Sequence, residues 1–93
     1  MLKIVAACGN GMGSSLMVKL KIESVCQEMG IDAHIDHMSI GDAKNVYRNY
    51  DIIICSQALL HNFSQLENIK VIGLRNLLST EEIKEKFIEN DIK

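Results

Sequence analysis

The feature that most constrains this chain is an apolar run near its beginning that stops abruptly in a glycine-rich segment. Residues 3–7 read Lys-Ile-Val-Ala-Ala, and residues 8–15 follow as Cys-Gly-Asn-Gly-Met-Gly-Ser-Ser. Apolar residues then recur at intervals that are typical of a helix, and most of its apolar face is expected to come from Leu16, Leu20, Ile22, Val25 and Met29. The pattern predicts a buried strand, a tight loop and a helix over residues 13–29, with Gly30 as its C-cap.

The loop after the predicted strand has the composition of a phosphate cradle. Glycines at alternate positions allow positive φ angles, so that successive N–H groups can converge on one anion. The positive end of the following helix dipole points at the same place, and a thiol there ionises easily. We therefore expect Cys8 to be the nucleophile. The residues expected to bind phosphate are Gly9, Asn10, Gly11, Met12, Gly13, Ser14 and Ser15.

Residue spacing argues against the best-known nucleotide loops. The Gly-Lys-Ser or Gly-Lys-Thr ending of a nucleotide P-loop is missing, and the GxGxxG dinucleotide pattern fails because position 14 is serine. The Cys-x5-Arg-Ser loop of tyrosine phosphatases is closer, but Ser14 takes the place of the arginine. That arginine would grip a phosphate and stabilise the transition state for its hydrolysis. The loop is therefore expected to pass a phosphoryl group on.

Composition and charge limit the class of protein. We expect one small α/β domain over residues 1–93. A formal charge of −2 without a basic block argues against nucleic acid as a partner. No apolar stretch approaches the roughly 18 to 20 residues that span a bilayer, so a soluble, cytoplasmic protein is expected. The spacing of Cys8, Cys26 and Cys55 matches no zinc or redox motif. We expect free thiols, no metal and no cofactor, with Cys26 and Cys55 buried and inert.

The rest of the chain alternates between strand and helix patterns. Strands are predicted over residues 31–38, 51–56 and 69–74, the first as an outer strand and the second as a central one. Helices are predicted over residues 43–47, 57–66 and 79–90. The last helix is predicted to begin with a capping box, in which Ser79 and Glu82 satisfy each other's backbone N–H groups. This order predicts a parallel sheet with helices on both faces.

Ligands of such sheets bind beyond the carboxyl ends of the strands. Besides Cys8, the edge formed by these ends should collect Ser39, Gly41, Ser56, Gln57, Arg75 and Asn76. Arg75 is the candidate contact to a phosphate or an anionic partner. Met12 and Met17 could form an adaptable apolar rim for docking. His34 and His37 are expected on opposite faces of the outer strand, solvated and not metal ligands.

Residues 3–15 resemble the active-site strand and loop of the IIB component of the bacterial phosphoenolpyruvate-dependent sugar phosphotransferase system, in its ascorbate-type (lactose-ascorbate superfamily) branch. Residues 51–54 and 71–79 resemble the third and fourth strand regions of that family. The resemblance covers nearly the whole chain. It implies a Rossmann-like α/β fold of three layers, with a four-stranded parallel sheet in the order 2-1-3-4 and a phosphatase-like loop.

The same resemblance implies a function. By position, Cys8 would take a phosphoryl group from a phosphohistidine of a IIA protein and deliver it to a sugar, ascorbate-like or related, held by the membrane IIC permease. The chain would then be a protein-phosphocysteine–sugar phosphotransferase, cytoplasmic and associated with the membrane through IIC. Two other classes stay open on the residues alone. One is a small phosphatase-like hydrolase without the loop arginine, and the other is a redox or anion-binding module.

Overall fold

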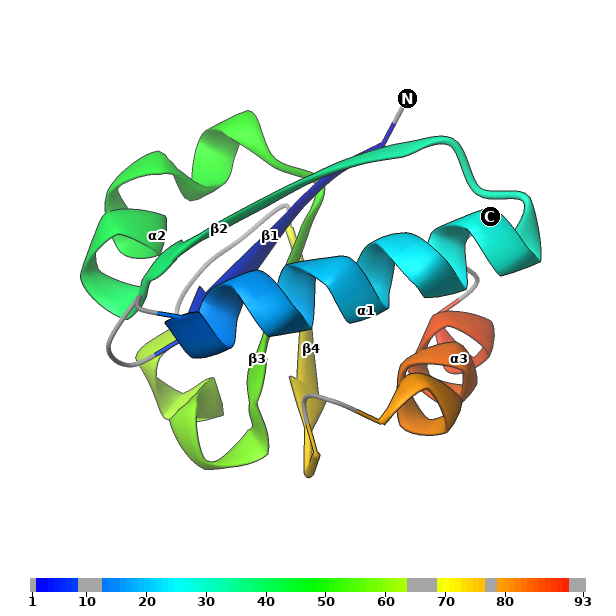
Figure 1. Ribbon diagram of the computed structural model, residues 1–93. Coiled ribbons are helices and arrows are strands. Elements are labelled where there is room, and N and C mark those ends of the chain that lie inside the picture. The colour runs from blue at the N-terminus through cyan, green and yellow to red at the C-terminus, as the bar shows by residue number, and fades with distance from the viewer. Residues whose placement is uncertain (1, 9–12, 64–68, 77–78, 91–93) are drawn as a thin grey trace.

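The computed structural model describes residues 2–8, 13–63, 69–76 and 79–90, but not the side chains of residue 8 or residues 13–15. Within these residues, the fold contains four strands and three α-helices, arranged as in Figure 1. The strands are β1 (Leu2–Cys8), β2 (Ala33–Ser39), β3 (Ile52–Ser56) and β4 (Lys70–Leu74). The α-helices are α1 (Gly13–Met29), α2 (Ile40–Val46) and α3 (Thr80–Glu89). Two 3-10 helices are η1 (Tyr47–Asn49) and η2 (Gln57–Phe63).

All strands pair in parallel, in the order β2-β1-β3-β4. This is the predicted order, with β2 as an outer strand and β1 and β3 in the centre. Cys8 pairs with Ser39 of β2, and Ser56 of β3 pairs with Leu74 of β4. Because the strands are parallel, their carboxyl ends lie along one edge of the sheet.

Helices cover both faces of the sheet, as predicted. Successive residues of a strand point to opposite faces, so β1 contributes to two separate cores. Ile4 and Ala6 pack in the core under α1 and α3, whereas Val5 and Ala7 pack in the core under α2 and η2. An ion pair of 2.7 Å between Lys84 of α3 and Glu28 of α1 joins the two helices that share a face. The result is a three-layer α/β sandwich.

Helix α1 has the predicted bounds and ends at the predicted cap. Gly30 adopts a φ of 72°, the left-handed conformation that glycine tolerates best. The next residue, Ile31, donates its N–H to the Cys26 carbonyl at 2.8 Å, which satisfies one of the last carbonyls of the helix. The chain then turns directly into β2.

The predicted apolar face of α1 is wrong in its first half. Leu16 and Leu20 are 47% and 51% exposed, whereas Val18 and Ile22 are buried. Residues two apart in a helix differ in direction by about 200°. Because Val18 faces the sheet, Leu16 and Leu20 on either side of it point away from the sheet. Two apolar side chains that the sequence assigned to the core therefore lie on the surface.

Two shorter elements also differ from the sequence prediction. Helix α2 begins at Ile40 and not at residue 43, because the hydroxyl of Ser39 accepts the N–H of Asp42 at 3.2 Å and caps the helix earlier. The segment after β3 is a 3-10 helix and not an α-helix. Its two core contacts, Leu60 and Phe63, are three residues apart, a spacing that aligns them on one side of a 3-10 helix.

Candidate functional site

The candidate site lies where β1 ends and α1 begins. Cys8 is the last residue of β1, a central strand, and α1 starts five residues later at Gly13. Figure 1 shows the first turn of α1 next to the carboxyl end of β1. This 17-residue helix has no acidic side chain in its first turn. No carboxylate from that turn therefore competes with a bound anion for the N–H groups and the positive dipole end of the helix. The arrangement favours an anion beside Cys8.

The cradle itself lies largely outside the described residues. Gly9, Asn10, Gly11 and Met12 are not among them, nor are the side chains of Cys8, Ser14 and Ser15. The backbone of residues 13–15 forms the first turn of α1, as expected. Phosphate binding by these residues therefore stays a prediction.

The other residues expected at this edge do gather there. Ser39 ends β2 in register with Cys8, and Gly41 lies in the first turn of α2. Ser56 ends β3, and Gln57 opens η2. Arg75 and Asn76 follow the last residue of β4 and are exposed. The Ser39 side chain has a structural role, since its hydroxyl caps α2.

The segment after β4 is bound by a residue of α3 in a way that the sequence did not predict. Glu82 of α3 accepts the backbone N–H of Arg75 on Oε2 at 2.7 Å and that of Asn76 on Oε1 at 2.9 Å. These two hydrogen bonds hold the pKa of the Glu82 carboxyl below its usual range. The predicted capping box forms only in part, because one of its two hydrogen bonds is missing. Ser79 accepts the Glu82 N–H at 3.3 Å, but the Glu82 carboxylate binds the two amides after β4 instead of the Ser79 N–H.

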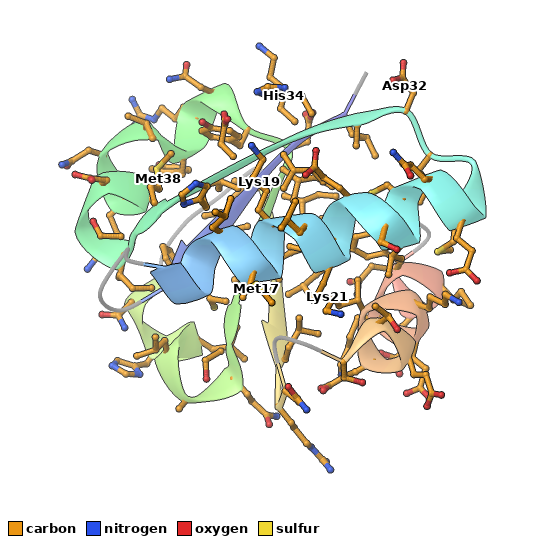
Figure 2. All side chains as sticks on the ribbon, viewed as in Figure 1. Met17, Lys19, Lys21, Asp32, His34 and Met38 are labelled. Carbon is orange, nitrogen blue, oxygen red and sulfur yellow. The ribbon has the colours of Figure 1, made fainter. Side chains whose placement is uncertain are left out.

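An exposed apolar patch adjoins the site on α1. It consists of Leu16, Met17 and Leu20, which are 47%, 48% and 51% exposed. Figure 2 shows Met17 projecting from the first half of α1, with Lys19 and Lys21 further along the helix. Met17 is exposed, whereas Met12, the other residue of the predicted apolar rim, lies outside the described residues, so the rim stays a prediction. An apolar patch with cationic neighbours suits contact with another protein.

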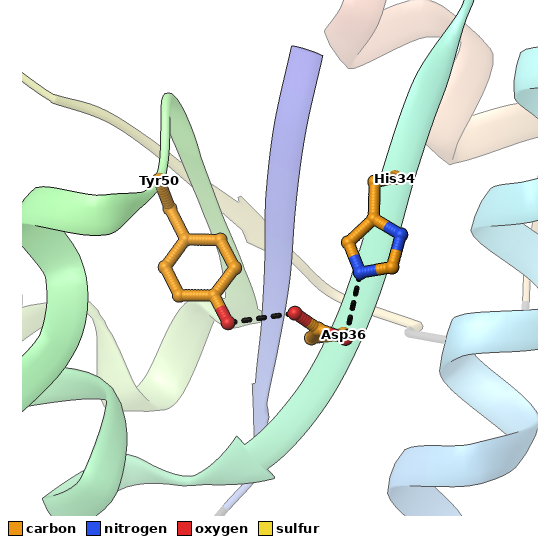
Figure 3. Close-up of polar contacts among 3 residues, drawn as sticks. All are labelled: His34, Asp36 and Tyr50. Carbon is orange, nitrogen blue, oxygen red and sulfur yellow. Dashed lines mark hydrogen bonds and ion pairs between the residues drawn. The ribbon is translucent and has the colours of Figure 1, made fainter. Parts of the chain in front are cut away.

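The two histidines of the outer strand differ in their surroundings. His34 is exposed, as predicted, and its Nε2 lies 3.1 Å from Asp36 Oδ1. Figure 3 shows that Tyr50 reaches the same carboxylate from the opposite side. His37 is only partly exposed, and its Nδ1 is buried with no hydrogen-bond partner among the described residues. His37 lies on the face of β2 that α1 covers, opposite to His34 as predicted, and is therefore less exposed to solvent than His34.

Two further cysteines have the inert surroundings that the sequence predicted. Cys26 and Cys55 are buried, with 3% and 0% of their surface exposed. Burial, assisted by the charge of Glu23, raises the pKa of the Cys26 thiol to about 11. A thiol with that pKa is almost wholly protonated at neutral pH.

Known proteins resemble this chain over nearly its full length. The family described as "PTS system, Lactose/Cellobiose specific IIB subunit" matches residues 3–89. The Ascorbate-specific PTS system EIIB component of Mycoplasma pneumoniae is 40% identical over 84 residues, which are 90% of this chain and 88% of that protein. The protein of the same name from Escherichia coli O157:H7 is 33% identical over 87 residues, covering 94% of this chain and 86% of the relative.

A solved structure has the same fold. It is the lactose-specific IIB component domain of the phosphoenolpyruvate:carbohydrate phosphotransferase system (PTS) from Streptococcus pneumoniae. It superimposes with a TM-score of 0.69 over 99% of this chain and 98% of that one, at 17% sequence identity. The predicted Rossmann-like IIB fold is thereby confirmed. Since the family match extends over residues 3–89 and a relative is 40% identical, this chain belongs to the lactose/cellobiose-specific IIB subunit family of the PTS, the sugar phosphotransferase system.

Proposed function

We propose that this IIB subunit carries the phosphoryl group on the sulfur of Cys8. IIB components of the PTS are phosphotransferases that work with IIA and IIC partners. The observation that supports Cys8 is its place at the end of a central strand, five residues before the N-terminus of a 17-residue helix. Cys26 and Cys55 are both buried and are poor candidates.

The first transfer takes the phosphoryl group from a phosphohistidine of the IIA protein. The Cys8 thiolate attacks phosphorus in line, the S–P bond forms, and the electrons of the N–P bond return to the histidine nitrogen. Backbone N–H groups of residues 10–15, with the Ser14 and Ser15 hydroxyls, hold the three phosphoryl oxygens. The positive end of α1 stabilises the charge of both the thiolate and the phosphocysteine.

The second transfer delivers the group to a sugar bound by the membrane IIC permease. A sugar hydroxyl attacks phosphorus and releases its proton to solvent, the O–P bond forms as the S–P bond breaks, and Cys8 leaves as a thiolate. Serine replaces the phosphatase arginine at position 14, so the loop holds the phosphoryl group without a guanidinium that would promote its hydrolysis. The phosphocysteine therefore lasts until the acceptor arrives.

Both partners dock on the edge that carries Cys8. The exposed patch of Leu16, Met17 and Leu20 supplies apolar contact area beside the reacting sulfur. Methionine adapts its shape to different surfaces, which suits a protein that binds two partners in turn. Docking on IIC places an otherwise cytoplasmic subunit at the membrane. Within the part of the chain that the structure describes, no helix is long and apolar enough to span a bilayer.

The sugar that we propose is ascorbate or a related compound. Relatives that are 40%, 34% and 33% identical to this chain are all named ascorbate-specific. The solved lactose-specific domain, at 17% identity, supports the fold and not the sugar. Neither a phosphatase-like hydrolase nor a redox module is favoured, because the family match spans residues 3–89 of the chain.

A reconstituted transfer assay tests this proposal. The protein is incubated with phosphoenolpyruvate, the general phosphotransferase proteins, an ascorbate-type IIA protein and vesicles that contain the matching IIC permease. We expect labelled ascorbate to become phosphorylated, with no product when Cys8→Ser replaces the wild type and undiminished product with Cys26→Ala. Phosphorylation of ascorbate by the Cys8→Ser variant would exclude the proposed carrier residue. Phosphorylation of lactose or cellobiose instead would overturn the choice of sugar alone.

A further inference from the structure

We propose that Glu82 is a positioning residue for phosphodonor docking, because its carboxylate fixes the backbone from which Arg75 extends at the edge that carries Cys8. Both oxygens of Glu82 are used, one on the Arg75 N–H at 2.7 Å and the other on the Asn76 N–H at 2.9 Å. This inference rests on the proposed function. It adds a residue that touches neither the phosphoryl group nor its donor.

The contacts of Glu82 differ from those of an ordinary helix cap. In a capping box its carboxylate would return to the N–H of Ser79, but that N–H donates to the Asn76 carbonyl at 3.1 Å. Ser79 already caps α3 through the Glu82 N–H at 3.3 Å. The Glu82 side chain is thus left to bind the two residues that follow β4. It links the first turn of α3 to the carboxyl end of the sheet.

The two amides that Glu82 binds belong to residues at the exposed end of β4. Leu74, the last residue of β4, is fully buried, whereas Arg75 and Asn76 are exposed. Exposed backbone that is not held in place has to be ordered when a partner docks, at an entropic cost. A carboxylate that accepts two charge-assisted hydrogen bonds holds the segment beforehand. Arg75 therefore extends from a fixed point, where its charge can meet an anionic, phosphorylated donor.

A double-mutant cycle between Glu82 and Arg75 tests the coupling. Transfer from a phosphorylated ascorbate-type IIA protein is measured at several donor concentrations for wild type, Glu82→Gln, Arg75→Gln and the double variant. We expect Glu82→Gln to raise the KM for the donor about five- to tenfold with little change in kcat, since docking and not the chemical step is affected. In the Arg75→Gln background the same change should leave KM unaltered, because the residue that Glu82 positions is gone.

Glu81→Gln is the matched control. Glu81 precedes Glu82 in the same first turn of α3, is exposed, and carries the same charge. Its substitution should leave KM within about twofold of wild type, since only an exposed surface charge is removed. An equal rise for Glu81→Gln and Glu82→Gln would show a general charge effect and overturn the proposal. So would a rise of KM for Glu82→Gln that is the same with and without Arg75.

A second measurement does not depend on phosphoryl transfer. In an NMR titration with acid, the chemical shifts of the Arg75 and Asn76 amide protons should change together as the Glu82 carboxyl is protonated. This change should occur at a pH below the usual pKa range of a glutamate. Amides that do not follow Glu82 would overturn the proposed link even if transfer is normal. If wild-type protein accepts no phosphoryl group while the amides do follow Glu82, the proposed function fails and the docking role fails with it, although the contact is real.

Discussion

Tyr50 donates its phenolic O–H to Asp36 Oδ2 at 2.7 Å, and this hydrogen bond crosses β1 to join the segment before β3 to the outer strand β2 (Figure 3). The other oxygen of the same carboxylate lies 3.1 Å from His34 Nε2. The bond with Tyr50 is the main cause of the lowered pKa of Asp36, and burial together with the carboxylate raises the pKa of Tyr50 to about 12. An outer strand has a neighbour on one side only, so this contact helps to hold β2 on the sheet.

Replacing Tyr50 by phenylalanine should weaken the fold without impairing transfer. The change removes the hydroxyl and keeps the ring, so the loss of one partly exposed hydrogen bond to a charged group should cost about 1 kcal/mol. Urea denaturation of Tyr50→Phe measures the free energy of unfolding. Arg48→Gln, at an exposed position in the same region, serves as a control. A variant as stable as wild type would show that this hydrogen bond contributes nothing to the fold.

The stabilisation by Tyr50 should depend on pH at both ends of the scale. The pKa of Asp36 is lowered in the fold, so its contribution is present above its unfolded value of 3.8 and lost as pH falls through the folded pKa. The pKa of Tyr50 is raised, so its contribution is complete below 10.0 and lost as pH rises through about 12. The difference in unfolding free energy between wild type and Tyr50→Phe should therefore be largest between these limits. A difference independent of pH from 3 to 11 would contradict this account.

Gly73 of β4 leaves no room for a side chain against η2. A Cβ atom there would lie 2.6 Å from Cδ1 and 2.7 Å from Cγ of Leu60. Gly73→Ala should therefore lower the free energy of unfolding by about 1–3 kcal/mol through overpacking. Leu60→Ala in the same chain should restore part of that loss, since it removes the atoms that clash. Urea denaturation of both single variants and the double variant checks this, and strictly additive losses would count against it.

The contribution of Glu82 to stability should disappear in acid. Its pKa is lowered by the hydrogen bonds from Arg75 and Asn76, so the stabilisation is present above the unfolded value of 4.5 and is lost as pH falls through the folded pKa. Thermal unfolding of wild type and Glu82→Gln should differ at pH 7 and converge well below pH 4. If wild type and Glu82→Gln had the same melting temperature as each other at pH 7 and also below pH 4, the two hydrogen bonds would contribute nothing to stability.

The exposed patch on α1 should matter for docking and not for folding. Leu20→Ser removes apolar surface from a side chain that is 51% exposed, so the free energy of unfolding should change by less than about 1 kcal/mol. The KM for the phosphorylated IIA donor should rise about tenfold, because apolar contact area in the interface is lost. Ile88→Ser, on α3 and 67% exposed, is the matched control and should leave KM unchanged. Equal KM values for the two variants would exclude the patch from the interface.

Much of this fold could be predicted because its signals are local. The apolar run before the glycine-rich loop, the helical spacing up to Gly30 and the β-branched run of β3 each depend on residues that are close in sequence. Parallel pairing then follows from the alternation of strands and helices. The strand order 2-1-3-4 came from family resemblance and was confirmed.

The errors concern contacts that local patterns do not determine. Leu16 and Leu20 looked like core residues because they recur at a helical interval, but the stripe that packs on the sheet runs through Val18 and Ile22. The Ser79 and Glu82 pattern predicted a closed capping box. The carboxylate instead binds amides beyond the cap, since the path of the chain from β4 into α3 brings them within reach. Neither the buried stripe of α1 nor the partners of the Glu82 carboxylate can be predicted before the positions of the helices on the sheet are known.

The central claim is that phosphorus becomes bonded to the sulfur of Cys8, and the most direct measurement is to locate that bond after transfer from phosphorylated IIA. Wild type, Cys8→Ser, Cys26→Ala and Cys55→Ala are each phosphorylated, examined by phosphorus NMR and intact mass, and treated with iodine, which releases phosphate from thiophosphates. We predict one phosphoryl group with S–P character on wild type and on the Cys26 and Cys55 variants, and none on Cys8→Ser. A phosphoryl group on Cys8→Ser, or one that resists iodine on the wild type, would contradict the claim.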